Sequence, residues 1–444
     1  GIVRVSGPLS VSLMDALFRP ADGKAMSQHR DRQLVYGKLL DEKGRTLDLC
    51  LCTLSRAPRS YTGEDTAELQ CHGSPVVLRS ALEALFALGA RQAAAGEFTK
   101  RAFLNGRMDL TQAEAVVDIV DAETPLAARN AASQLGGAIS RRTEEIYQNL
   151  THICSHYHAV LDYPDEDIPP FTLAEYAAVL DASIRSLEAL LATFSRGQFL
   201  EKGVRTAILG RPNAGKSSLL NALLGFERAI VTDIAGTTRD TIEETATVGR
   251  VMLRLCDTAG IHEAQDEVEA LGIARSHKKL REAELVLCVF DPSRPYDERD
   301  RTVTEAVASS DAGCRIALLN KSDLPRVWTP EQVGLDTVFG TVLPISCASG
   351  EGIDTLRDTV EKRYVDGSLR YDTDAVLTNA RQYAAAQLAE ESVRRAVVAL
   401  ENGMTQDIAG MDLEEALAQL GALDGRQVTE EIVDTIFHRF CVGK

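Results

Sequence analysis

Residues 210–217 read GRPNAGKS, which fits the pattern GxxxxGK followed by Ser or Thr. An apolar, strand-like run at residues 204–209 precedes this stretch, and a helical run at residues 218–224 follows it. A glycine-rich loop between a strand and a helix can hold phosphate groups with its backbone N–H groups and with the helix N-terminus. An ordinary glycine-rich turn is the alternative explanation, but such a turn does not require a strand before it and a helix after it. The stretch therefore predicts a P-loop nucleotide-binding domain.

The positions of this loop have different expected tasks. Lys216 should reach the β and γ phosphates of a bound nucleotide, and Ser217 should ligate Mg²⁺. The residues predicted here to bind nucleotide are Asn213, Ala214, Gly215, Lys216, Ser217 and Ser218.

A second motif, DTAG at residues 257–260, follows a predicted strand at residues 251–256. Asp257 can bind Mg²⁺ through water, and Gly260 can offer its backbone N–H to the γ phosphate. A turn after a strand would explain this motif in isolation. Its position after the phosphate loop favours the nucleotide-binding interpretation.

A third motif, NKSD at residues 320–323, contains Asn320, Lys321 and Asp323. The Asp323 carboxylate can accept hydrogen bonds from the ring N–H and the amino N–H of guanine. Adenine lacks this pair of donors, so the motif indicates GTP rather than ATP. A helix N-cap is the alternative explanation of NKSD taken alone.

The fourth motif comprises Ser346 and Ala348, which follow the next predicted strand. The backbone N–H of Ala348 is expected to bond the guanine oxygen. Four motifs in this order predict a domain that binds and hydrolyses guanine nucleotides.

The group that orients the attacking water is not evident from these motifs. Ile261 follows Gly260, where small regulatory GTPases carry a glutamine, and its apolar side chain cannot position water. Glu269 begins the next helical run and is the candidate catalytic residue. Its alternative role is that of an ordinary acid in the first turn of a helix.

Residues 232–238 read TDIAGTT and form a polar loop. Thr238 is a natural second ligand of Mg²⁺. The loop is either an ordinary polar loop, or its oxygens, together with Asn213, hold a monovalent cation such as K⁺ beside the β and γ phosphates. We include Thr232, Thr237 and Thr238 among the expected nucleotide-site residues.

The whole chain has 444 residues, 45% of them hydrophobic, and a formal net charge of −17. Such an acidic protein should contact nucleic acid only through local basic patches. Cys50 and Cys52 form a CxC pair, but no CxxC pair is present, so neither a zinc site nor a disulfide framework is expected. Reduced thiols and the lack of a membrane-spanning apolar run favour a cytoplasmic protein without membrane contact.

The pattern of short strands and helices changes along the chain, which predicts several domains. Residues 1–108 form a small α/β domain, residues 109–203 and 367–444 are helical, and residues 204–366 alternate strands with helices. We expect a mostly parallel sheet in that third segment, covered on both faces. The two helical segments either form one domain with the α/β domain inserted or two separate bundles, and the shortness of the second segment favours insertion.

The sequence resembles the MnmE (TrmE) family of tRNA modification GTPases along essentially its whole length. Besides the nucleotide motifs, the resemblance rests on stretches from both ends and the middle of the chain: GIVRVSG at 1–7, YTGED at 61–65, GEF at 96–98, RAFLNG at 101–106, GTTRD at 236–240 and FCVGK at 440–444.

This resemblance implies a multidomain α/β plus all-α fold: a Ras-like P-loop G domain inserted into a helical domain, and an N-terminal α/β domain that binds folate and forms a homodimer. It implies hydrolysis stimulated by K⁺ when two G domains meet. Glu269 would orient water, and Ser217 and Thr238 would bind Mg²⁺. The implied K⁺ ligands are Asn213, Thr232, Ile234 and Thr237, of which Thr232 and Ile234 would bind through their backbone carbonyl oxygens.

The resemblance also implies substrates and a partner. With the flavin-dependent protein MnmG (GidA), the family installs an aminomethyl-type group on the wobble uridine of tRNA, using a tetrahydrofolate derivative (5-formyl or 5,10-methylene). The matching folate positions are Arg4, Glu68, Arg107 and Lys444. Arg107 stands where a lysine is expected, which keeps the charge but changes the geometry.

Two other functions are compatible with parts of the sequence. A ribosome-assembly or signalling GTPase would usually carry a basic RNA-binding appendage, whereas the flanking segments here are acidic and helical. A folate enzyme with a decayed G domain would not keep intact motifs at every nucleotide position.

Overall fold

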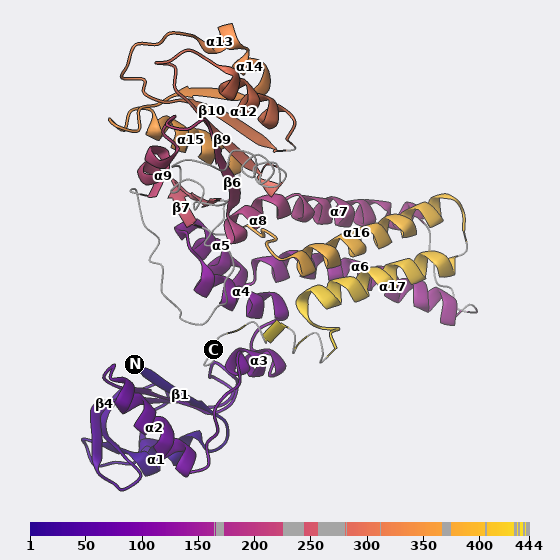
Figure 1. The fold of residues 1–444 in the computed structure, drawn as a ribbon. Helices are drawn as coiled ribbons and strands as arrows, with labels where there is room; N and C mark the ends of the chain where they lie inside the picture. The colour runs from indigo at the N-terminus through magenta and orange to yellow at the C-terminus, as the bar shows by residue number, and fades with distance from the viewer. Residues whose placement is uncertain are drawn as a thin grey trace. The chain divides into compact units, whose positions relative to one another are not determined.

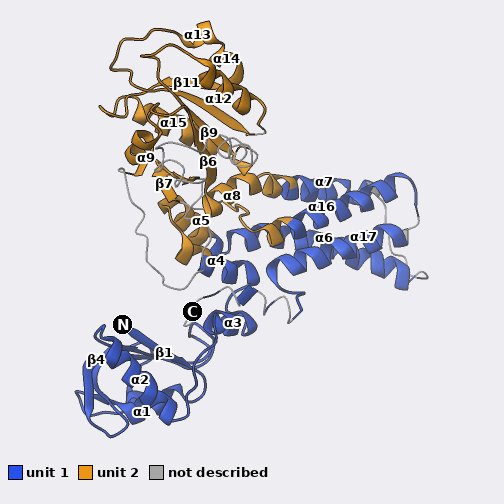
Figure 2. Ribbon diagram, viewed as in Figure 1, with its two compact units in different colours: residues 1–117, 134–187, 384–444 blue, residues 118–133, 188–383 orange. Residues whose placement is uncertain are grey.

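The computed structural model describes residues 1–163, 165, 173–224, 244–255, 280, 282–310, 312–365, 374–404, 406–429, 433, 436–437 and 440 (Figure 1). The chain forms two compact units (Figure 2). The first contains residues 1–117, 134–187 and 384–444, and the second contains residues 118–133 and 188–383.

The N-terminal part of the first unit is an antiparallel sheet with helices on one face. Its described strands run in the order β1-β5-β4-β3-β2. The elements are β1 (Ile2–Ser6), α1 (Ser10–Leu17), β2 (Phe18–Pro20), η1 (Met26–Gln28), β3 (Val35–Leu40), β4 (Thr46–Ser55), β5 (Thr66–Gln70), α2 (Pro75–Ala87) and α3 (Glu97–Leu104). Buried side chains of α1, α2 and the strands, such as Met14, Leu85 and Leu69, form a common core.

Buried and exposed residues alternate along the strands, which shows that one face of this sheet is covered. In β3 the residues Val35, Gly37 and Leu39 are buried, whereas Tyr36 and Lys38 are exposed. Successive side chains of a strand point to opposite faces, so one face contacts the helices and the other contacts solvent.

Long helices make up the rest of the first unit and continue into the second. They are α4 (Leu110–Asp121), α5 (Pro125–Leu135), α6 (Ala138–Asp162), α7 (Leu173–Leu191), α8 (Phe194–Lys202), α16 (Ala380–Glu401) and α17 (Gln406–Asp424). Leu150 of α6, Leu180 of α7, Val393 of α16 and Leu413 of α17 lie in one buried apolar core. Helices from both sides of the G-domain sequence therefore pack together, as the inserted arrangement requires.

The second unit is built on a sheet whose described strands run in the order β11-β10-β9-β6-β8-β7. All neighbouring strands are parallel except β7, which pairs antiparallel with β8. The elements are β6 (Val204–Leu209), α9 (Lys216–Leu224), β7 (Glu244–Val248), β8 (Val251–Leu255), β9 (Leu285–Phe290), α12 (Glu298–Ala308), β10 (Cys314–Leu319), α13 (Pro330–Val333), α14 (Leu335–Val338), β11 (Thr341–Pro344) and α15 (Ile353–Tyr364).

Strand β9 shows why this sheet needs cover on both faces. All six of its residues are buried. Leu285 and Leu287 belong to the core that contains α9 and α15, whereas Val286 and Cys288 belong to the core that contains α12 and α14. The predicted fold class, a Ras-like α/β domain combined with helical and N-terminal α/β parts, is confirmed.

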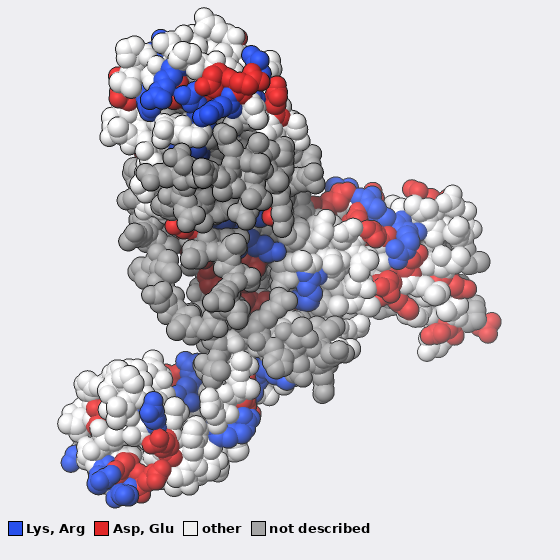
Figure 3. Space-filling model, viewed as in Figure 1, with Lys and Arg blue, Asp and Glu red and all other residues white. Residues whose placement is uncertain are grey.

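Two surface properties bear on function. None of the helices in the described part of the chain has the length and apolar character needed to cross a membrane. On the face drawn in Figure 3, acidic and basic side chains lie interspersed rather than in large areas of one sign.

Candidate nucleotide site

The phosphate loop lies between β6 and α9, where its glycines are sterically required. Gly210 has φ +149° and Gly215 has φ +107°. A Cβ atom at Gly210 would lie 2.4 Å from the carbonyl oxygen of Val289, and one at Gly215 would lie 2.0 Å from Nδ2 of Asn320. Because real Cβ atoms do not approach other atoms so closely, neither position accepts a larger residue without moving the loop.

Lys216 is held against the inside of this loop. Its Nζ donates hydrogen bonds to the carbonyl oxygens of Gly210, at 2.8 Å, and Arg211, at 2.9 Å. Burial lowers the pKa of the Lys216 ammonium group from its usual value. The lysine is thus prepositioned where its charge can face a phosphate with little rearrangement.

Asn320 joins the phosphate loop to the base-recognition loop. Its side chain is almost fully buried, with 3% exposed. Nδ2 donates to the carbonyl oxygen of Ala214 at 2.9 Å, and Oδ1 accepts from the backbone N–H of Cys347 at 3.1 Å. The predicted nucleotide residue Asn320 therefore also acts as a clamp between two loops that the sequence places more than a hundred residues apart.

Lys321 contacts an acid that the motif analysis did not single out. Lys321 adopts a left-handed backbone conformation, with φ +61°, and its Nζ lies 2.5 Å from Oδ2 of Asp291. Burial alone would raise the pKa of Asp291, but hydrogen bonds from Lys321 and Ser293 outweigh it, so the pKa is lowered and the carboxylate stays charged. Asp291 follows the buried strand β9 directly, a position that could have identified it.

Arg211 makes a second contact that sequence reasoning missed. One nitrogen of its guanidinium group, Nη1, lies 2.9 Å from Oδ2 of Asp297 and 3.1 Å from Oδ2 of Asp300. Both acids lie at the start of α12, and Asp297 also caps that helix. The phosphate loop is therefore fixed to the neighbouring helix through the second residue of its motif.

The three described loops face one cavity of about 460 Å³. Its lining comprises Pro212, Asn213, Gly215, Lys216, Ser217, Ser218, Asn320, Lys321, Asp323, Leu324, Ser346, Cys347 and Ala348. The volume lies in the range typical of small-molecule sites. Asp323 is exposed at this cavity, whereas Ser346 is completely buried and donates its backbone N–H to Glu351.

Comparison with known proteins identifies the family. Residues 1–107 match the family model described as "GTP-binding protein TrmE N-terminus", and residues 110–441 match "MnmE helical domain". The "tRNA modification GTPase MnmE" of Clostridioides difficile is 39% identical over 444 residues, covering 100% of this chain and 96% of the relative. The chain belongs to the MnmE family of tRNA modification GTPases.

Other relatives show the same full-length coverage. Proteins named "tRNA modification GTPase MnmE" from Lachnoclostridium phytofermentans and Akkermansia muciniphila are each 41% identical, over 445 and 447 residues. In both comparisons the whole of this chain is matched, against 96% and 95% of the relatives. The chain is accordingly a GTPase, as the sequence predicted.

Several predicted residues of this MnmE-family protein lie outside the described residues. They are Thr232, Ile234, Thr237, Thr238, Asp257, Gly260, Glu269 and Lys444. Their assigned tasks in binding Mg²⁺ or K⁺, in catalysis and in binding folate therefore stay predictions.

Of the three predicted folate residues in the N-terminal part, two form a pair with each other and the third bonds elsewhere. Arg4 on β1 is directly opposite Glu68 on β5, and its Nε lies 2.7 Å from Oε1 of Glu68. The Arg4 guanidinium group also lies 5.7 Å from the ring centres of Tyr61 and Phe98. Arg107 instead donates through Nε to the carbonyl oxygen of Ser60 at 3.2 Å.

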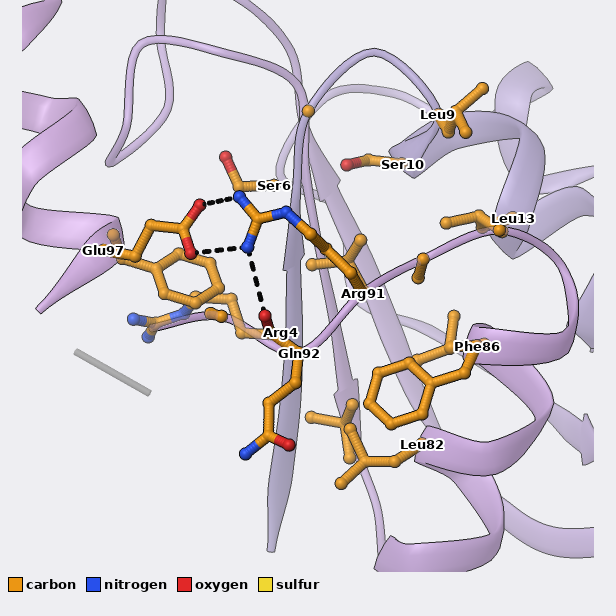
Figure 4. A pocket seen from close by; sticks show the side chains of 18 of the residues that line it. Arg4, Ser6, Leu9, Ser10, Leu13, Leu82, Phe86, Arg91, Gln92 and Glu97 are labelled. Carbon is orange, nitrogen blue, oxygen red and sulfur yellow. Dashed lines mark hydrogen bonds and ion pairs between the residues drawn. The ribbon is translucent and has the colours of Figure 1, made fainter. Parts of the chain in front are cut away.

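A cavity of about 570 Å³ lies beside Arg4 (Figure 4). Figure 4 shows Arg91 paired with Glu97 on one side and Leu82 and Phe86 of α2 on the other. The hydrogen bond from Arg91 is the largest cause that lowers the pKa of Glu97, to about 2. The cavity thus combines an apolar wall with fixed charges, whereas Glu68 and Arg107 are not part of its lining.

Proposed function

We propose that GTP binds in the 460 Å³ cavity with its phosphates at the loop that contains Lys216 and its base near Asp323. The observation that carries this proposal is the Asn320 side chain, which connects Ala214 of the phosphate loop with Cys347 beside the base. One buried residue would thereby keep both halves of the site at the spacing of a nucleotide.

Guanine selectivity would come from Asp323. Its carboxylate lines the cavity and is free to accept two N–H donors of the base edge, an arrangement that only guanine satisfies. The backbone of Ala348 lines the same cavity and would offer its N–H to the guanine oxygen.

We propose that two metal ions, Mg²⁺ and K⁺, bind to oxygen ligands of the G domain. Ser217 is exposed in the first turn of α9 and lines the cavity, so its hydroxyl suits Mg²⁺, with Thr238 as the second protein ligand. K⁺ would be held by Asn213, which is exposed and lines the cavity, together with Thr232, Ile234 and Thr237. The ions would neutralise charge on the phosphates, while Glu269 would orient the attacking water.

The tRNA-directed part of the function rests on family membership. Relatives over the full length are named tRNA modification GTPases. We propose that the chain acts with a flavin-dependent MnmG (GidA) partner to form the 5-(carboxymethyl)aminomethyl-type group on the wobble uridine of tRNA. A tetrahydrofolate derivative, 5-formyl or 5,10-methylene, would bind near Arg4, Glu68, Arg107 and Lys444.

The proposed assembly is a homodimer formed through the N-terminal domain, whose predicted extent is residues 1–108. The predicted boundaries of the other domains stay at 109–203, 204–366 and 367–444. We place the protein in the cytoplasm, because the seven described cysteines are all free, which suits a reducing compartment.

A complementation experiment tests the proposed function. A strain that lacks the gene is supplied with either the wild-type chain or Lys216→Ala, and the nucleosides of its purified tRNA are measured by mass spectrometry. We expect loss of the wobble-uridine modification in the deletion strain, recovery with the wild type, and no recovery with Lys216→Ala. An unchanged nucleoside profile in the deletion strain would contradict the proposal and favour a ribosome-assembly or signalling GTPase.

A further inference from the structure

A cluster of metal-ligating side chains lies in the N-terminal sheet, separate from the nucleotide cavity. Asp48 and Cys50 lie on β4, and Cys71 directly follows β5. Their ligand atoms, two thiol sulfurs and a carboxylate oxygen, all lie within 4.8 Å of one another. Among the described residues, this is the one group of three or more His, Cys, Asp or Glu side chains close enough to share a metal ion.

The sheet register brings these residues together. Strands β4 and β5 are antiparallel, with Leu51 opposite Gln70, so the next pair along the ladder is Cys50 and Cys71. Asp48 is two residues before Cys50 and therefore points to the same face of β4. The spacing of the cysteines along the sequence predicted no zinc site, because it cannot reveal a pair that forms across two strands.

The three ligand groups of the cluster are largely shielded from solvent. Cys50 is 4% exposed and Cys71 is 7% exposed. The side chain of Asp48 is 10% exposed, and its carboxylate lies 2.8 Å from Nδ1 of His72. With both thiols deprotonated the three ligands would carry three negative charges, of which a divalent cation would offset two.

His72 fixes the orientation of the carboxylate from outside the cluster. Its backbone N–H donates to Oδ2 of Asp48 at 2.9 Å, and its Nδ1 lies 2.8 Å from Oδ1. Oδ1 also accepts the backbone N–H of Leu49 at 2.7 Å, so it is Oδ2 that keeps a further lone pair for a metal. Ligating carboxylates are commonly oriented by such outer hydrogen bonds, which contribute to metal affinity.

We propose that Asp48, Cys50 and Cys71 form a binding site for Zn²⁺, with water in the fourth position. Sulfur and carboxylate ligands suit this ion. Bond lengths of about 2.3 Å to sulfur and about 2.1 Å to oxygen place tetrahedral ligand atoms roughly 3.5–4 Å apart, which the cluster reaches with small movements. The bound ion would connect β4 to the end of β5. This site shares no residue with those proposed above to bind GTP or folate.

Co²⁺ is the probe for the test, because a tetrahedral site with thiolate ligands gives an ultraviolet charge-transfer band and visible d–d bands. The full-length protein, reduced and freed of metal, is titrated with Co²⁺ and then with Zn²⁺. We expect one Co²⁺ per chain with these bands, and loss of the bands when Zn²⁺ displaces it. Cys50→Ala and Cys71→Ala should abolish the charge-transfer band.

Three further variants keep the result interpretable if a cysteine variant fails to fold. Asp48→Asn preserves the side-chain volume, and it should shift the d–d bands and weaken binding. His72→Ala changes an exposed side chain, and it should weaken Zn²⁺ binding about 10- to 100-fold. Cys154→Ala, which removes a buried thiol in the helical core, is the matched control and should leave both spectrum and affinity unchanged.

The proposal is overturned by any of three results. These are the absence of a charge-transfer band in the reduced wild type, an undiminished band in folded Cys50→Ala or Cys71→Ala, and wild-type affinity in both Asp48→Asn and His72→Ala. Isolation of a Cys50–Cys71 disulfide from protein kept under reductant, with no cobalt band, would also overturn it.

Discussion

Replacing Asn320 with alanine tests whether a single buried amide connects the two halves of the nucleotide site. The change removes the donor to Ala214, at 2.9 Å, and the acceptor for the N–H of Cys347, at 3.1 Å. A buried group left without its partner costs about 1–3 kcal/mol. If this cost falls on the nucleotide-bound state, the affinity for GDP decreases roughly 5- to 150-fold.

The assay follows binding of a fluorescent GDP analogue to the full-length protein. Trp328, the one tryptophan of the chain, is buried against Phe290 and Tyr296 of the same unit, so its fluorescence reports in parallel whether that unit is folded. Asn402→Ala is the matched control, because Asn402 is exposed just after α16 and its amide nitrogen donates to the carbonyl oxygen of Val398 in that helix. Affinity within about twofold of the wild type for folded Asn320→Ala would refute the clamp.

Four further outcomes follow from the site. Asp323→Asn should weaken GTP binding and favour xanthosine triphosphate, and unchanged GTP affinity in a direct titration would remove Asp323 from the site. Glu269→Ala should leave GTP affinity nearly intact but lower turnover by roughly 10²-fold or more. Hydrolysis at the wild-type rate would mean that another group orients the attacking water. Hydrolysis should rise with K⁺ but not with Na⁺ at equal ionic strength, and Asn213→Ala should abolish this difference; equal rates in both salts would exclude the cation site. Because the folded-state pKa of Glu97 lies at about 2, below its usual value of 4.5, its ion pair with Arg91 stabilises the folded state above about pH 4.5 and this contribution is lost as the pH falls toward about 2. The unfolding free energies of wild type and Glu97→Gln, measured by urea titration, should therefore converge over that range, and a constant difference would contradict this.

Local patterns predicted the elements that carry the nucleotide motifs. Strands β6 and β8 were each expected within one residue of their observed bounds, because parallel buried strands read as continuous apolar runs. Strand β7 was not expected. It pairs antiparallel at the edge of the sheet, and its sequence, ETATV, lacks a long apolar run.

Contacts between distant segments could not be predicted in this way. The pairing of Lys321 with Asp291 depends on two parallel strands, β9 and β10, ending at the same edge of the sheet. The approach of Cys50 to Cys71 depends on the register of two antiparallel strands. Both follow from strand order and register, which no local periodicity contains.

Hydrolysis of GTP and ATP by the full-length protein is the measurement that tests the central claim most directly. With Mg²⁺ and K⁺ present, we expect the wild type to release phosphate from GTP but not from ATP, and Lys216→Ala to lose this activity. Equal rates with ATP, or full GTP hydrolysis by Lys216→Ala, would contradict the assignment of the 460 Å³ cavity as the GTPase site.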